Sequence, residues 1–177
     1  MKKTFLTLLL MTVMTTIPAL AQQDNPLLKD WKTPPFSQIK NEHYAPAMRV
    51  AMKAQADAVN RIVKQKDAPT FDNTILALEL SGERLEKVAG VLFSLNECFT
   101  NEEMQQIVMD LIPELTRHEN SISLNDRLFE RVKMIYDKRD QLGLNAEQMI
   151  LLERTYKGFA RNGALLDKKA KKQYAAN

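Results

Sequence analysis

The chain has 177 residues, of which 45% are hydrophobic and 27% charged, and its formal net charge is +3 at pH 7. This length suits one globular domain, and a charge so close to zero predicts no nucleic-acid partner. The single cysteine, Cys98, excludes an internal disulfide. Because Cys98 lies in an apolar stretch, we expect it to pack as a small hydrophobic residue.

Residues 1–21 have the three parts of an export signal. Lys2 and Lys3 form a positively charged start, an apolar run follows, and Ala19-Leu20-Ala21 forms a cleavage site of the A-x-A type. The apolar run is shorter than the roughly 20 residues that span a bilayer as a helix, which favours a cleaved signal over a membrane anchor. We therefore expect an exported protein, periplasmic or extracellular, with no membrane attachment after signal cleavage.

Residues 22–42 are predicted to form an extended arm, because three prolines in this stretch forbid a continuous helix. Trp31 and Phe36 are expected to pin the arm to the body of the protein. The first helix is expected to start near Ala45 and to end before Pro69.

The body, residues 43–177, repeats apolar residues at intervals of three and four, which predicts helices and no strands. The second helix begins after Thr70 as its cap. It is apolar on two sides, so it should lie between neighbouring helices. Gly82 and Gly90 lie on or near its apolar stripes and are expected to allow close helix contacts.

Three further helices and a short last one follow from cap and stop signals. Thr100 with Glu103 forms a capping box for the third helix. The fourth helix is capped by Asn125 and closed by Gly143, and the fifth is capped by Asn145 with Gln148 and closed by Gly163. A sixth helix covers about Asp167 to Ala175, and its lysines are expected to form a solvated face. The predicted fold is all-α: an antiparallel, bundle-like array of five to six helices preceded by the arm.

No group of residues has the spacing of a catalytic or metal site. A zinc peptidase needs two histidines one helical turn apart with a glutamate between them, whereas this chain has only His43 and His118. We expect His43 at the start of the first helix and His118 on the exposed side of the third. The aromatic residues fall at helical spacing and are expected in the core: Phe71, Phe93, Phe129, Tyr136, Tyr156 and Phe159. We predict no catalytic, cofactor-binding or metal-binding residue in this chain.

A series of short phrases nevertheless points to a longer enzyme. The phrases are Pro35-Phe36, Glu42 to Ala47, Pro69 to Ile75, Leu124 to Lys133 and Leu151 to Tyr156. In this order and at these spacings, the chain from about Pro26 to Asn177 resembles the amino-terminal region of the thimet-oligopeptidase family of zinc metallopeptidases, and within it the peptidyl-dipeptidase branch.

The resemblance implies what the rest of such an enzyme contains. In this family, early helices form one wall of a deep channel that admits only short peptides, and the zinc-binding H-E-x-x-H motif lies much later in the chain. The implied partners are therefore the missing carboxyl-terminal catalytic region or a separately encoded half, with zinc and short peptides in the full-length enzyme. The alternative is a stand-alone, non-catalytic helical module that binds peptides or a partner. Whether the chain is a gene fragment, a split enzyme or such a module stays open here.

Overall fold

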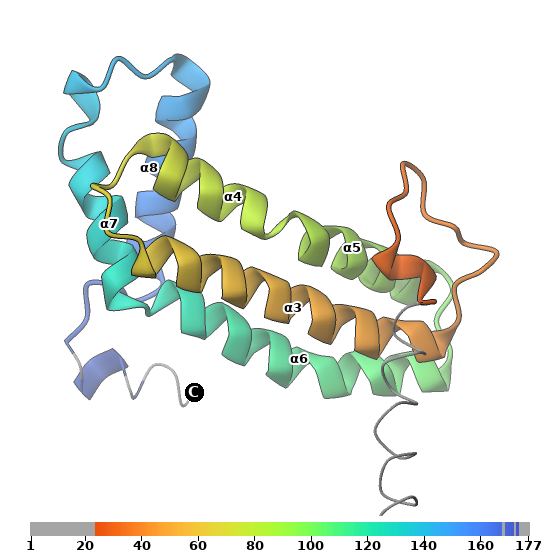
Figure 1. Ribbon diagram of the computed structural model, residues 1–177. Coiled ribbons are helices and arrows are strands. Elements are labelled where there is room, and N and C mark those ends of the chain that lie inside the picture. The colour runs from red at the N-terminus through yellow and green to blue at the C-terminus, as the bar shows by residue number, and fades with distance from the viewer. Residues whose placement is uncertain (1–23, 168, 172, 174–177) are drawn as a thin grey trace, which may run out of the picture.

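The computed structural model describes residues 24–167, 169–171 and 173 (Figure 1). The expected signal, residues 1–21, therefore lies outside the described residues. Within them the regular structure consists of helices and helical turns and no strand occurs, which confirms the predicted all-α class.

Three long elements form the centre of the molecule. Helix α3 (Asn41–Lys64) lies between α5 (Glu83–Cys98) and α6 (Glu102–Ser123) and contacts both. In Figure 1, α3 and α6 run in the same direction, and α5 runs opposite to both. The array is therefore only partly antiparallel.

A second group of elements packs at the carboxyl end of α3. It consists of the π-helical turn η2 (Phe71–Leu76), α7 (Asp126–Tyr136) and α8 (Ala146–Arg161), with the short turn η3 (Arg139–Gln141) between the last two. Figure 1 shows α7 and α8 side by side and crossing the end of the central helices.

Each group has its own core. The first core joins the arm to α3, α5 and α6 through residues that include Leu27, Met48, Val88, Leu92 and Leu111. The second joins the end of α3 to η2, α7 and α8 through Ile62, Ile75, Leu128, Val132 and Leu152. Because α3 contributes buried residues to both cores, it links the two groups.

The arm is attached by residues other than those expected. A 3₁₀ turn, η1 (Pro26–Leu28), buries Leu27 to 2% exposure, and the side chain of Asn25 caps that turn by accepting from the Leu27 N–H at 3.0 Å. Trp31 packs against the first core as predicted. The prediction for Phe36 was wrong, since its side chain is 55% exposed.

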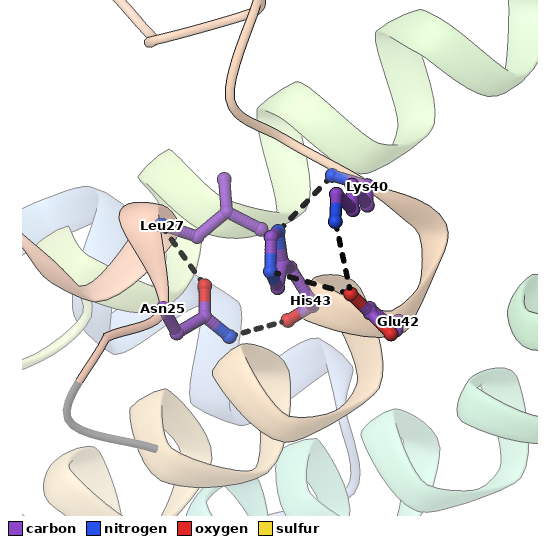
Figure 2. Close-up of polar contacts among 5 residues, drawn as sticks. All are labelled: Asn25, Leu27, Lys40, Glu42 and His43. Atoms are coloured by element: carbon purple, nitrogen blue, oxygen red, sulfur yellow. Dashed lines mark hydrogen bonds and ion pairs between the residues drawn. The ribbon is translucent and has the colours of Figure 1, made fainter. Parts of the chain in front are cut away.

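Helix α3 begins at Asn41, several residues before the predicted start near Ala45. The Nδ1 atom of His43 accepts from the Lys40 N–H at 3.0 Å, which satisfies one backbone donor at the start of the helix (Figure 2). Pro46 is thus inside the helix rather than at its beginning. The start of this helix was predicted from Pro46, because proline is common in the first helical turn. That prediction missed the cap provided by His43.

The predicted second helix is divided into η2, α4 (Ala77–Ser81) and α5, with Gly82 between the last two. Thr70 caps its start as predicted, by accepting from the Asn73 N–H at 3.1 Å. A Cβ atom on Gly82 would lie 3.1 Å from Nε2 of Gln55, so Gly82 does allow a close contact with α3. The prediction for Gly90 was wrong, because Gly90 faces open space.

The third helix is capped one residue later than predicted. Asn101, not Thr100, accepts from a backbone N–H of the first turn, that of Met104, at 2.9 Å. Glu103 does not reach back to the cap but accepts from the side chain of Asn41 at 2.7 Å. Just before this cap Cys98 is exposed, so the prediction that it packs in the core was also wrong.

The remaining helix boundaries follow the predicted caps more closely than the predicted stops. Asn125 caps α7, and Asn145 with Gln148 caps α8, as predicted. Gly163, at φ +88°, follows the end of α8, whereas α7 ends at Tyr136, well before Gly143.

Only part of the predicted sixth helix is described. Residues 169–171 and 173 are helical, whereas 168, 172 and 174–177 lie outside the described residues. The predicted solvated lysine face is incomplete, because Lys171 pairs with Asp126 of α7 and its side chain is largely buried.

Candidate functional site

The two histidines have structural partners. His43 lies at the start of α3 as predicted, where Nδ1 is occupied by the Lys40 N–H and Nε2 lies 3.9 Å from Oε1 of Glu42 (Figure 2). Its backbone carbonyl accepts from Nδ2 of the buried Asn25 at 2.8 Å, which ties the arm to α3. His43 therefore serves the folding of this end of the molecule.

His118 was predicted to lie on the exposed side of the third helix, and this prediction was wrong. The side chain is half-buried between α6 and α3. Its Nε2 lies 2.7 Å from Oε1 of Gln55, so that the ring N–H can donate to the amide oxygen. Burial lowers the pKa of His118 below its usual value, because the charged imidazolium would lose water contacts. A neutral ring is the form that this site favours.

The described residues do not bring together the ligands that a zinc site needs. No group of three or more His, Cys, Asp or Glu side chains gathers there in a way that could hold a metal ion. Nδ1 of His43 accepts from the Lys40 N–H, and Nε2 of His118 is hydrogen-bonded to the side chain of Gln55 on α3.

A groove of about 550 Å³ lies on the surface formed by the described residues. Its walls come from α4 and α5 on one side and from α6 on the other, α8 contributes to it, and Gln55 of α3 contributes from between them. Its apolar lining consists of Leu78, Leu85, Ala89, Phe93, Leu115, Ile122 and Phe159. The groove is therefore built by the two core groups together.

The charged residues that line this groove are mainly acidic. Glu79 and Glu86 come from the α4–α5 side and Glu119 from α6, whereas Arg154 of α8 is the lining arginine. None of the three carboxylates makes an ion pair with a side chain of the described residues. The groove thus combines an apolar surface with an excess of negative charge.

Two polar links fix the elements around the groove. Arg49 of α3 donates two hydrogen bonds to Glu114 of α6, at 3.0 and 2.7 Å. This contact holds the pKa of Glu114 below its usual value, since the hydrogen bonds favour the carboxylate. Arg131 of α7 donates to the Asp67 carbonyl, to Asn73 and to Thr74, and so fixes the turn before α4.

Aromatic stacking fixes α8 against α7. The rings of Tyr136 and Tyr156 lie 3.9 Å apart and nearly parallel, and Phe129 stacks on Tyr156 and on Phe159 with centroids 5.7 and 5.9 Å apart. The guanidinium of Arg139 covers the Tyr136 ring at 4.4 Å. These contacts confirm the core role predicted for the aromatic residues of α7 and α8.

The groove was not foreseen from the sequence, although part of its signal was present. Leu78, Gly82, Leu85 and Ala89 belong to one of the two apolar stripes predicted for the second helix. That stripe does lie against neighbours, but its outer edge is left uncovered and forms the groove. Which edge is uncovered depends on α6 and α8, whose placement involves contacts far apart in the sequence.

Within the described residues, no helix combines the length and the apolar character needed to cross a membrane. The apolar run in residues 1–21 lies outside that search.

Comparison with characterised proteins finds relatives that are much longer than this chain. The dipeptidyl carboxypeptidase of Escherichia coli K12 is 39% identical over 154 residues, which are 86% of this chain and 22% of that protein. The dipeptidyl carboxypeptidase of Salmonella typhimurium is 36% identical over 146 residues, 80% of this chain and 22% of that protein. Oligopeptidase A of E. coli is 25% identical over 150 residues, which are 85% of this chain and 22% of that protein. No family model matches the chain. The chain thus spans about a fifth of the length of the curated relatives it matches.

Proposed function

This chain is homologous over most of its length to a region of the thimet-oligopeptidase family of metallopeptidases, and from this relationship we propose that it is the amino-terminal helical part of an exported zinc peptidase. The full enzyme removes dipeptides from the carboxyl ends of short peptides. In this proposal the helices of the chain form part of the wall around the substrate channel, and the zinc site belongs to the remainder of the enzyme.

The observation that carries the proposal is the 39% identity to a dipeptidyl carboxypeptidase over 86% of the chain. The identity to oligopeptidase A is lower, at 25% over a similar length, which supports the peptidyl-dipeptidase branch. The export part of the proposal is supported only by the pattern of residues 1–21.

The first test is made on the purified chain itself. Zinc-dependent hydrolysis of peptides requires a closely spaced set of metal ligands and a catalytic glutamate. Because the described residues hold no such set, we expect much less than one zinc per chain after dialysis. We also expect no release of dipeptides from a short peptide in the presence of added zinc. Stoichiometric zinc, or zinc-dependent release of dipeptides, would contradict the division of roles proposed here.

The second candidate function is a stand-alone helical module that binds peptides or a partner protein. The groove of about 550 Å³ between α4–α5, α6 and α8 favours it, because such a surface could serve binding without any catalysis. The DNA that follows the codon for Asn177 separates the two candidates. An H-E-x-x-H motif encoded there, in the same frame or an adjacent one, supports the peptidase; its absence favours the module.

A further inference from the structure

We propose that the groove between α4–α5, α6 and α8 seats one amphipathic α-helix with an apolar face and basic flanks, contributed by the part of the peptidase that lies outside this chain. The source of the helix rests on the proposed function. Its chemistry rests on the groove alone.

The apolar lining is the first argument. Leu85 and Ala89 of α5 face Leu115 and Ile122 of α6 across the groove, and Phe159 of α8 completes its lining. Of these side chains, Ala89, Leu115 and Ile122 stay half-exposed along the groove, whereas Leu85 and Phe159 are buried beneath it. An apolar surface of this kind is buried against a partner in many proteins.

The backbone of the walls argues for a helix rather than an extended peptide. Every wall of the groove is helical, so the wall backbone groups in mid-helix are already paired within their own elements. An extended peptide would find no strand edge here with which to pair its own N–H and C=O groups. A helix satisfies its backbone internally and needs only side-chain contacts.

The length of the groove suits such a helix. Its lining on the α4–α5 side runs from Leu78 to Phe93, which at 1.5 Å per residue is roughly 22 Å, or about four helical turns. A partner helix of four turns presents an apolar residue at every third or fourth position. That spacing matches the one on the walls.

The charges of the groove select basic flanks. Glu79, Glu86 and Glu119 lack ion-pair partners among the described side chains, and they outnumber the single lining arginine, Arg154. Lysine or arginine on the flanks of the incoming helix would meet these carboxylates, and complementary charge raises the rate of association and fixes orientation. An acidic helix of the same apolar pattern would be repelled.

The test measures peptide binding to the complete chain. Overlapping 20-residue peptides cover the part of the E. coli dipeptidyl carboxypeptidase that this chain does not match. Alongside them, a designed 18-residue helix with a leucine stripe and lysine flanks is compared with its glutamate-flanked counterpart. We expect the lysine-flanked helix to bind at least about tenfold more tightly than the glutamate-flanked one. Among the covering peptides, we expect binding only from segments with a basic amphipathic pattern.

Variants locate the binding on the chain. Ala89→Trp fills the groove and Glu86→Lys reverses one of its charges, so each should weaken binding of the lysine-flanked helix at least several-fold. The matched controls Ala54→Trp and Glu130→Lys lie on exposed positions outside the lining and should bind as the unaltered chain does. Thermal melts of all four variants verify that each is folded.

The outcomes separate the two proposals. Equal binding of the two designed helices, absence of binding, or equal loss in control and groove variants would overturn the groove inference. Groove-dependent binding of the designed helix with no binding by any peptide of the E. coli enzyme would overturn the proposed source of the helix. None of these results bears on the identity to the peptidase family, which is tested separately by activity.

Discussion

At the scale of single residues, Arg131 ties distant parts of the chain together. It joins α7 to the turn before α4 by three hydrogen bonds, at 3.2 to 3.3 Å, to Asp67, Asn73 and Thr74. Thr74 is fully buried. Removing the guanidinium would leave these acceptors without one of their donors.

We predict that Arg131→Ala lowers the free energy of unfolding by about 1–3 kcal/mol, the usual cost of removing hydrogen bonds to a charged group in a partly buried site. The measurement is urea unfolding at neutral pH. Arg127→Ala, at an exposed position of the same helix, is the control and should change the free energy by less than about 0.5 kcal/mol. Equal effects of the two substitutions would contradict this role of Arg131.

His118, which lines the groove, should make the stability of the folded chain depend on pH. Burial lowers its pKa in the folded chain below the usual value of about 6.5, so the unfolded chain binds more protons just below that pH. Stability is therefore complete above about pH 6.5 and falls as the pH drops from there through the folded pKa. Unfolding of the chain and of His118→Asn, compared between pH 7.5 and 5, should differ in slope in that direction. Parallel curves would show that His118 contributes nothing to it.

At the scale of elements, local signals predicted the caps that involve short polar side chains acting within one turn. Thr70, Asn125 and Asn145 are such caps. The start of α3 was missed because its cap is a histidine. The break at Gly82 was also missed, at a position where a Cβ atom would lie 3.1 Å from Nε2 of Gln55 on α3. Sequence periodicity carries no signal for contacts of this kind.

The position of the α6 cap can be tested directly. Because Asn101 accepts from the Met104 N–H, Asn101→Ala should lower the free energy of unfolding by about 0.5–2 kcal/mol. Thr100→Ala should cost clearly less, since Thr100 is exposed and its hydroxyl donates to the Asn96 side chain rather than accepting from a backbone N–H among the described residues. Urea unfolding of both variants gives the comparison, and a larger effect at Thr100 would restore the cap predicted from the sequence.

At the scale of the whole molecule, the all-α class and the order of the helices were predictable from the sequence, whereas the groove was not. The groove forms where α6 and α8 leave one edge of the α4–α5 stripe uncovered, and this follows from packing between residues far apart in the chain. Exposed large apolar side chains also occur on other helices, including Met109 and Ile112 of α6 and Ile150 of α8. If the proposed function holds, we expect these surfaces to pack against the rest of the peptidase.

We therefore predict that the isolated chain gives a strongly helical circular dichroism spectrum but binds a dye for exposed apolar surface, self-associates and melts with weak cooperativity. The dye signal should fall when the lysine-flanked helix is added, because that helix covers the groove. A monodisperse monomer with a sharp two-state melt and no dye binding would instead favour the stand-alone module.

The central claim is that this chain is the helical amino-terminal part of a peptidyl-dipeptidase, and activity of a chimera tests it most directly. In the chimera, this chain replaces the matched region of the E. coli dipeptidyl carboxypeptidase, to which it is 39% identical. We predict that the chimera binds one zinc and releases dipeptides with a kcat/KM within about a hundredfold of the parent, a loss of less than about 3 kcal/mol in transition-state stabilisation. A folded, zinc-bound chimera without dipeptide release would contradict the claim.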